Sequence, residues 1–330
     1  LPKEKKMKTF FKIVGIASTI AFCSSVSAQT TLKLAHAAPE SDLQQDMSLF
    51  FKKEVEARTN GDIKINIFPQ GQLGNDKQMI DGTRSGILDF SMVGVNNYSG
   101  FLPESSAFTL PFIFPTRESA YTALDGAPGK EVLVSMEKFG IKGLGYPESG
   151  YRNVTNSRQP IRTPADLEGL QMRVNGSKAL NDMFNELKAN PQQIPVAELY
   201  SALETGVVDA QDHPIGVTLS FKFYEVQKYL SMTQHAYSPL VLTMNLKKFN
   251  KLSAENQKII TEVSKEAVDM QRKLSIAKED QMIADLESHG MKVNRDVDGA
   301  AFQEVVKPVW ASFIEANGDD MINKIQAATK

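Results

Sequence analysis

Arg173 is the residue whose type and setting point most directly to chemistry. It lies in the largely apolar run GLQMRV at residues 169–174, which has the composition of a buried strand. A guanidinium that is buried without a partner is costly, so it needs an anion, and its planar fork fits a carboxylate through two parallel hydrogen bonds. The segment therefore predicts a clamp for a small acid. The alternative is a salt bridge to an aspartate of the core.

Arg152 and His213 are predicted to join Arg173 at the same site. Arg152 would contact a carboxylate or a hydroxyl group of the ligand; its alternative is a surface position, since most arginines are exposed. A neutral imidazole both donates and accepts hydrogen bonds, so His213 suits a ligand rich in hydroxyl groups. Its alternative is packing in the core or at an interface between domains.

Three asparagines extend this candidate site. Asn175 lies two residues after Arg173 and points to the same side if the strand continues. Asn96 and Asn97 follow the end of a predicted strand, where α/β clefts collect ligands. Amide groups donate and accept hydrogen bonds, which is what a neutral, hydroxylated ligand surface requires.

Tyr237, Glu148 and Asp76 complete the candidate ligand-binding residues. A carboxylate repels an anionic ligand, so Glu148 and Asp76 could only accept hydrogen bonds from hydroxyl groups. For both residues the alternative is a role in helix capping or in a hinge.

An enzyme is the main alternative class of protein, but the sequence contains little that supports enzymatic activity. The four histidines are scattered, the only cysteine is Cys23, and no His-x-x-x-His or cysteine cluster is present to hold a metal. There is no G-x-S-x-G elbow, P-loop or G-x-G-x-x-G fingerprint. We expect no catalytic residues, no metal and no cofactor. A sugar-acid isomerase built on arginine, histidine and aspartate is the remaining enzymatic alternative.

The elements that position these residues are predicted from an alternation of strand and helix patterns along the chain. This alternation predicts an α/β fold. Residues 31–36, 62–68 and 88–93 have the pattern of strands. Residues 41–58 and 77–84 have the pattern of helices, the first capped by Ser41 or Asp42. Two such units fit an open sheet that binds its ligand at the strand ends.

Residues 254–289 contain no glycine and no proline, with Ser253 able to cap the start and Gly290 able to end the segment. One helix of this length would extend roughly 54 Å, more than a small domain. It would then belong to both domains. The alternative is two helices with an unmarked break.

Residues 1–28 are predicted to be a signal peptide rather than part of the fold. Lysines precede an uncharged, mostly apolar run at residues 13–22, and Val26-Ser27-Ala28 has the small residues of a cleavage site. The apolar run is too short for a membrane helix, which needs roughly 20 residues. Met7 is the natural start, which makes residues 1–6 an upstream extension. A buried N-terminal helix is the alternative.

The charge of the chain argues against nucleic acid as a partner. The whole chain carries −2 and residues 1–28 carry +4, so the remaining residues carry −6. A mildly acidic protein without a basic run binds nucleic acids and anionic membranes poorly. About 300 residues predict two domains.

Several short motifs resemble one family in their order and spacing. They are FPQGQLGND at residues 68–76, GILDF at 86–90, LPFIF at 110–114, DGAPG at 125–129 and VVD at 207–209. With the arginine segments, they resemble the solute-binding proteins of tripartite ATP-independent periplasmic (TRAP) transporters. The resemblance implies a two-lobed α/β solute-binding (Venus-flytrap) fold with a long helix spanning both lobes. Lobe I would comprise residues 29–149 plus 239–278, and lobe II residues 150–238 plus 279–330.

The resemblance is narrower at residues 95–97, 150–158, 209–214 and 235–240, where the chain is similar to the 2,3-diketo-L-gulonate-binding branch. This implies a six-carbon sugar acid, either a gulonate-like aldonate, a keto-aldonate or a uronate, with Arg173 on its carboxylate. Many relatives have asparagine where this chain has His213, which argues against carrying over a sialic-acid or dicarboxylate specificity. A C4-dicarboxylate or another organic acid is the alternative ligand.

The family also implies a location and partners. The protein would be a periplasmic monomer that delivers its ligand to membrane-embedded TRAP permease subunits driven by an ion gradient. The alternative partner is a receptor kinase that senses the loaded protein.

Overall fold

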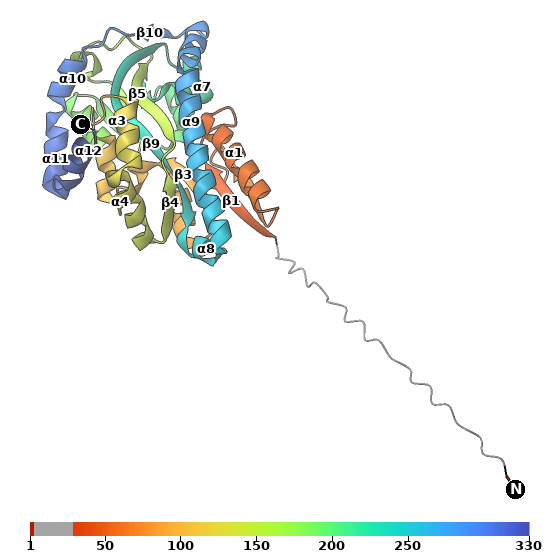
Figure 1. The fold of residues 1–330 in the computed structure, drawn as a ribbon. Helices are drawn as coiled ribbons and strands as arrows, with labels where there is room; N and C mark the ends of the chain where they lie inside the picture. The colour runs from red at the N-terminus through yellow and green to blue at the C-terminus, as the bar shows by residue number, and fades with distance from the viewer. Residues whose placement is uncertain (3–28, 330) are drawn as a thin grey trace.

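The computed structural model describes residues 1–2 and 29–329. The predicted signal peptide at residues 1–28, with its upstream extension 1–6, lies outside these residues apart from the first two, so it stays a prediction. Residues 29–329 form two α/β lobes, and a long helix runs along one side of both (Figure 1). No helix within the described residues is both long enough and apolar enough to cross a membrane.

The first lobe is built on a mixed sheet in which β1 lies between two parallel neighbours, β2 and β3. The alternation predicted for residues 31–36 holds from Thr31 to Leu34, whereas Ala35 and His36 are both buried. The end of β9 pairs antiparallel with both β3 and β4. The strands are β1 (Thr30–His36), β2 (Ile63–Phe68), β3 (Phe90–Gly94), β4 (Ile141–Gly145) and β9 (Tyr229–Asn245).

The second lobe is built on the other half of β9, which pairs antiparallel with β5 and parallel with β10. The sheet then continues through β8 and β6 to the edge strand β7. Its further strands are β5 (Glu148–Asn156), β6 (Gln171–Val174), β7 (Asn190–Gln193), β8 (Ala210–His213) and β10 (Lys292–Asn294).

Two strands therefore cross between the lobes side by side. β9 is long enough to belong to both sheets, and β5 pairs with it across the crossing. The pairing is irregular between Glu148 and Gly150, and Gly150 has a φ of 113°, which a residue with a Cβ rarely adopts. A local bend at this point is consistent with a hinge.

Helices of the first lobe follow the predicted boundaries closely. Asp42 caps α1 by accepting a hydrogen bond from the Gln44 amide, and Asn75 caps α2 through a reciprocal capping box with Gln78. Both caps place the start of a helix directly at the strand ends, where the lobes face each other. The elements are α1 (Leu43–Arg58), α2 (Asp76–Ser85), η1 (Val95–Tyr98), η2 (Pro103–Thr109), α3 (Arg117–Asp125), α4 (Ala127–Ser135), η3 (Met136–Phe139) and α8 (Leu246–Lys251).

Helices of the second lobe cover its sheet, and the C-terminal helices reach back to the first lobe. The final helix, α12, packs against α3 and α4 although the sequence assigned residues 279–330 to lobe II. The exact lobe boundaries thus stay a prediction. The elements are η4 (Pro164–Leu167), α5 (Lys178–Glu186), α6 (Val196–Glu204), α7 (Ile215–Ser220), η5 (Phe223–Glu225), α10 (Gly299–Val305), α11 (Lys307–Asn317) and α12 (Asp320–Ala328).

The long helix predicted for residues 254–289 is one continuous helix, α9 (Ala254–Ser288). Ser253 caps its start, and Gly290 follows its end with a φ of 94°. The helix packs against α1 and β4 of the first lobe and against α7 and β10 of the second. It therefore spans both lobes, as Figure 1 also shows.

The lobes touch across the cleft between them. The Ser220 hydroxyl of α7 donates a hydrogen bond of 2.8 Å to Asp42 at the cap of α1. A Cβ at Gly176 would lie 3.3 Å from the side-chain oxygen of Asn97 on the opposite lobe. The structure is thus a closed form.

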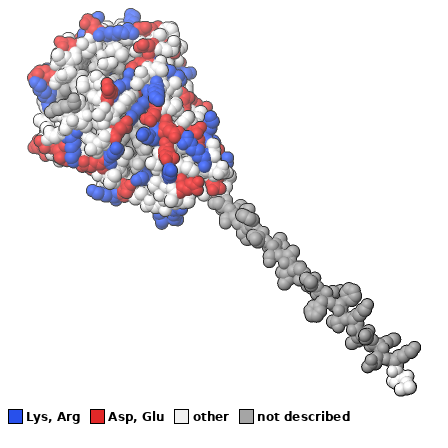
Figure 2. Space-filling model, viewed as in Figure 1, with Lys and Arg blue, Asp and Glu red and all other residues white. Residues whose placement is uncertain are grey.

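The visible face carries acidic and basic side chains intermixed, with no continuous basic stripe (Figure 2).

Candidate functional site

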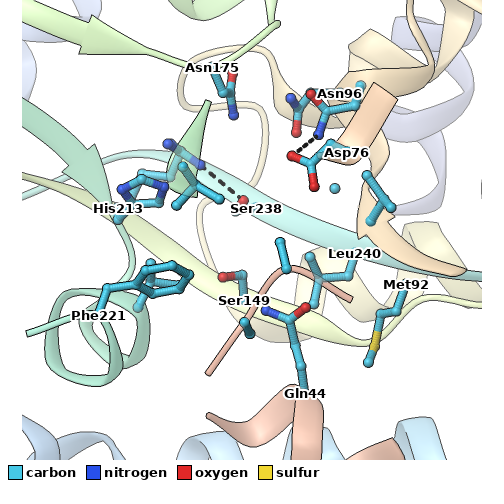
Figure 3. A pocket seen from close by; sticks show the side chains of 18 of the residues that line it. Gln44, Asp76, Met92, Asn96, Ser149, Asn175, His213, Phe221, Ser238 and Leu240 are labelled. Atoms are coloured by element: carbon cyan, nitrogen blue, oxygen red, sulfur yellow. Dashed lines mark hydrogen bonds between the residues drawn. The ribbon is translucent and has the colours of Figure 1, made fainter. Parts of the chain in front are cut away.

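Two cavities that share several lining residues lie between the lobes, and Arg173 lines both. The inner cavity has a volume of about 80 Å³, and the outer one has about 460 Å³. Figure 3 shows His213 and Asp76 on opposite sides of the inner cavity, with Asn175 above and Gln44 below. The predicted residues that line the inner cavity are Asp76, Asn96, Asn97, Arg152, Arg173, Asn175 and His213.

Arg173 comes from β6 and is only 2% exposed. Its Nε donates to the carbonyl of Ile194 at 2.8 Å, and its Nη1 donates to Nε2 of His213 at 3.1 Å. Burial lowers the pKa of Arg173 to about 10, which still leaves it charged at neutral pH. Neither partner is an anion, and no carboxylate of residues 29–329 forms an ion pair with it. Its charge therefore calls for an anionic ligand.

Arg152 has a different environment, because its charge is matched by the buried Asp212. Its Nε lies 2.6 Å from Oδ2 of Asp212, and its Nη2 lies 3.0 Å from Oδ1. Burial alone would raise the pKa of Asp212, but the charge of Arg152 and hydrogen bonds from His235 and Arg152 hold it well below its usual range. The remaining Nη1 donates to Ser238 at 3.2 Å. The core salt bridge considered for Arg173 thus belongs to Arg152, whose contact with ligand stays a prediction.

His213 holds Arg173 in place. Guanidinium nitrogens only donate, so Nε2 of His213 must accept from Arg173, and its Nδ1–H then donates to the Gln211 side chain. Burial and the charges of Arg173 and Arg152 keep the pKa of His213 well below its ordinary value, so the ring is neutral. Both ring nitrogens are occupied by protein groups in this closed form. These contacts orient the guanidinium, and a direct contact of His213 with ligand stays a prediction.

The opposite wall of the inner cavity is formed by polar side chains of the first lobe. Asp76 accepts a hydrogen bond of 3.2 Å from Nδ2 of Asn97. Burial raises the pKa of Asp76, while Arg173 and Asn97 act in the other direction. Asn96 is buried, and its Nδ2 has no hydrogen-bond partner among the residues that the structure describes. Because a buried donor without a partner is costly, this amide is suited to an acceptor on a bound ligand.

Asn175 stands on the side of Arg173, as predicted from its place two residues along the chain. Its Oδ1 accepts from the Ser177 amide at 3.0 Å, which leaves its NH₂ group for the cavity. The strand ends at Val174, but the turn that follows keeps the side chain on the same side.

Glu148 and Tyr237 do not line either cavity. The hydroxyl groups of Tyr121 and Tyr237 both donate to Oε2 of Glu148, at 2.8 and 2.7 Å. Gln271 of α9 pairs with the backbone N–H and carbonyl of Glu148. These contacts fasten the long helix to the crossing strands, which is the hinge alternative considered for Glu148. A ligand contact by either residue remains an untested prediction.

Several lining residues escaped the sequence analysis, among them Gln44, Ser149 and Val196. Gln44 lies in the first turn of α1, directly after the end of β1 and its loop. The rule that α/β clefts collect ligands at strand ends could have indicated it. Ser149 and Val196 carry no comparable signal.

The stability of the protein is expected to fall as the pH falls below about 6.5, the ordinary value for histidine. Burial lowers the pKa of His36, His213 and His235. The unfolded chain then binds more protons than the folded one in this window, so protonation favours unfolding. Thermal melts should give a lower Tm at pH 5 than at pH 7.5, and His213→Asn should flatten the curve. A Tm that is constant or higher at pH 5 would contradict this.

Comparison with known proteins reveals one family. The model of the family "Bacterial extracellular solute-binding protein, family 7" matches residues 34–317. The 2,3-diketo-L-gulonate-binding periplasmic protein YiaO of Escherichia coli is 40% identical over 301 residues, which cover 91% of this chain and 92% of YiaO.

Solved structures of similar proteins agree with this family. A TRAP periplasmic solute-binding protein from a Polaromonas species, bound to D-erythronate, is similar in structure with a TM-score of 0.88 and 35% sequence identity. The match covers 91% of this chain and 99% of the Polaromonas chain. The sugar-acid-binding protein DctPAm of Advenella mimigardefordensis, in complex with galactonate, has a TM-score of 0.88 and 31% sequence identity. The match covers 91% of this chain and 98% of DctPAm.

Proposed function

Because the chain belongs to family 7 of the bacterial extracellular solute-binding proteins, which serve TRAP transporters, we propose that it captures a sugar acid between its lobes and delivers it to a membrane permease. The family is periplasmic, and the predicted signal peptide at residues 1–28 would take the chain there. The observation that carries the proposal is the buried charge of Arg173, which lacks a carboxylate partner within residues 29–329.

The remaining lining supports a sugar acid over a simpler acid. Opposite Arg173 the first lobe offers the carboxylate of Asp76 and the amides of Asn96 and Asn97. A carboxylate accepts hydrogen bonds from hydroxyl groups but repels a second acid group. A C4-dicarboxylate would bring its second carboxylate to this wall, so a ligand with one acid group and several hydroxyls fits better. The relatives named for 2,3-diketo-L-gulonate and galactonate agree with this class.

Binding and closure are coupled in this proposal. An acid held by Arg173 of the second lobe offers its hydroxyl groups to the first lobe, so it stabilises the closed form by its differential affinity. Closure also removes water from around the guanidinium, which strengthens its attraction to the carboxylate. The permease then recognises the closed, loaded protein. The carrier leaves its ligand chemically unchanged, so no enzymatic activity is proposed.

A thermal-shift screen of aldonates, keto-aldonates, uronates and C4-dicarboxylates tests the function. A ligand at 100 times its Kd stabilises the folded protein by about 2.7 kcal/mol, which raises Tm by about 5 °C. We expect six-carbon sugar acids to shift Tm most, and mass spectrometry should recover the bound acid unaltered. A larger shift with C4-dicarboxylates, or recovery of an altered product, would contradict the proposal.

His213→Asn is expected to change the ranking of acids more than the overall affinity. Asparagine is shorter than histidine, so it no longer supports Nη1 of Arg173 in the same way and leaves an amide free toward the ligand. Calorimetry with L-gulonate, D-galactonate, D-galacturonate and succinate measures the ranking. An unchanged order across these four acids would remove His213 from the residues that set specificity.

A further inference from the structure

One direct polar contact joins the two walls of the cleft. Ser220, the last residue of α7, donates its hydroxyl hydrogen to Oδ2 of Asp42 at 2.8 Å. Among the residues that the structure describes, no other hydrogen bond or ion pair joins residues 29–97 to residues 173–225. Most of the residues that line the two cavities belong to these two segments. The contact therefore has no polar counterpart between these segments.

Both partners are fixed within their own lobes before they meet. Oδ1 of Asp42 accepts a hydrogen bond of 2.9 Å from the Gln44 N–H at the start of α1, so its Oδ2 is left for the other lobe. Val217 lies one turn before Ser220 on α7 and lines the inner cavity, so this side of α7 faces the first lobe. Groups that are already ordered lose little freedom when they pair, which makes the hydrogen bond more effective.

Aromatic contacts connect Ser220 to the predicted ligand clamp. The next residue, Phe221, lines the inner cavity and also a third cavity of about 560 Å³, which residues of both lobes line. Figure 3 shows Phe221 on the same side of the inner cavity as His213. The ring of Phe221 lies 5.6 Å from that of Phe223, which in turn lies 5.7 Å from the ring of His213. His213 accepts from Arg173, so packed side chains extend from the interlobe contact to the guanidinium.

We propose that the hydrogen bond between Ser220 and Asp42 is a latch, which holds the lobes closed and sets how long a bound acid stays in the cleft. This inference rests on the proposed function and adds two positioning residues to it. Neither Ser220 nor Asp42 lines the inner or the outer cavity, so both act through the position of the lobes. When the lobes separate, water replaces each partner. The latch therefore stabilises only the closed form.

Ser220→Ala removes the latch and leaves the cavity walls as they are. Ser220→Thr is the conservative variant, because threonine keeps the hydroxyl group and Ser220 is only partly buried, which leaves room for a methyl group. Ser264→Ala is the matched control. The Ser264 hydroxyl donates to the Ile260 carbonyl at 2.7 Å within α9, so this variant loses a hydrogen bond that does not join the lobes.

Calorimetry with D-galactonate measures affinity, and a chase of radiolabelled D-galactonate with unlabelled acid measures the rate of release. Hydrogen bonds to charged groups are the stronger ones, so Ser220→Ala should bind about tenfold more weakly, or by about 1.4 kcal/mol. The loss should appear as about tenfold faster release with an unchanged association rate, because the latch forms after the acid has entered. Ser220→Thr and Ser264→Ala should release the acid as the unaltered protein does.

Two further readouts separate a latch from a general role in stability. The Tm of the ligand-free protein should be the same with and without Ser220→Ala, because the open form lacks the contact. Asp42→Asn keeps a residue that can cap α1 and removes the charge that Ser220 meets. In the Ser220→Ala background, Asp42→Asn should cause no further increase in release rate, since two residues that act through one contact are not additive.

The outcomes distinguish this inference from the function on which it rests. If the unaltered protein binds D-galactonate and Ser220→Ala releases it at the unaltered rate, the latch is wrong and the function stands. The same holds if Ser220→Thr releases the acid as fast as Ser220→Ala, because packing would then be responsible. If the unaltered protein binds no sugar acid, the function fails, and the latch with it. Should Ser220→Ala not fold, a crystal structure of the unaltered protein with D-galactonate decides. Oγ of Ser220 should lie within about 3 Å of Asp42, and a separated pair would overturn the latch.

Discussion

Replacing Arg173 with alanine is expected to abolish measurable binding of sugar acids while the protein stays folded. Two charge-assisted hydrogen bonds of about 1.5–3 kcal/mol each would be lost, which weakens binding at least about 100-fold. The fold should tolerate the change, because no carboxylate of residues 29–329 is paired with Arg173 and would be left alone. Its partners are a carbonyl and a neutral imidazole. Isothermal calorimetry measures the affinity, and a thermal melt checks the fold.

Arg173→Lys is the matched variant, since it keeps the charge and removes the fork. A single ammonium cannot make two parallel hydrogen bonds or reach both Ile194 and His213 as the guanidinium does. We expect a loss above about tenfold, or 1.4 kcal/mol. If the alanine variant bound sugar acids as tightly as the unaltered protein, the clamp would be rejected. If the lysine variant lost less than about tenfold in affinity, the two-pronged geometry would be rejected.

Asp212→Asn is expected to destabilise the protein strongly. Asp212 is fully buried, and its carboxylate neutralises Arg152 and accepts a hydrogen bond from His235. Removing one partner of a buried ion pair leaves the other charge uncompensated, which costs about 3–5 kcal/mol. Urea unfolding should show a lower midpoint with little change in slope.

The control for this prediction is Asp81→Asn, because Asp81 pairs with Lys77 on the surface of α2. An exposed pair of this kind contributes about 1 kcal/mol or less. If Asp212→Asn and Asp81→Asn lowered the free energy of unfolding equally, the Arg152–Asp212 pair would not have the role that its burial indicates.

Local patterns in the sequence predicted the parts of the fold that depend on local interactions. The apolar alternation before His36 and the cap residue Asp42 determine the first strand and helix with little help from the rest of the chain. The segment after Ser253 contains no helix breaker, and the structure has one helix there. The buried setting of Arg173 was also readable, since its neighbours in the strand are apolar.

Pairings between distant residues could not be predicted in this way. Arg152 and Asp212 are 60 residues apart, and only the antiparallel pairing of β5 with β8 brings them together. The same pairing gives Arg152 an acidic partner, whereas no carboxylate of residues 29–329 forms an ion pair with Arg173. Both residues are arginines, and the residue type does not show which of them has an acidic partner in the fold.

His213 and Tyr237 illustrate a second limit. The residue type shows that a side chain can form hydrogen bonds, but not whether another protein group has already taken them. The ring of His213 is occupied by Gln211 and Arg173, and the hydroxyl of Tyr237 is occupied by Glu148. Only the folded arrangement reveals which polar groups remain for a ligand.

A crystal structure of the protein with a bound sugar acid such as D-galactonate tests the central claim most directly. We expect the acid enclosed between the lobes, with its carboxylate oxygens within about 3 Å of the Arg173 guanidinium, the usual length of a charge-assisted hydrogen bond. A carboxylate bound elsewhere in the cleft, with Arg173 still facing only His213 and Ile194, would contradict the account.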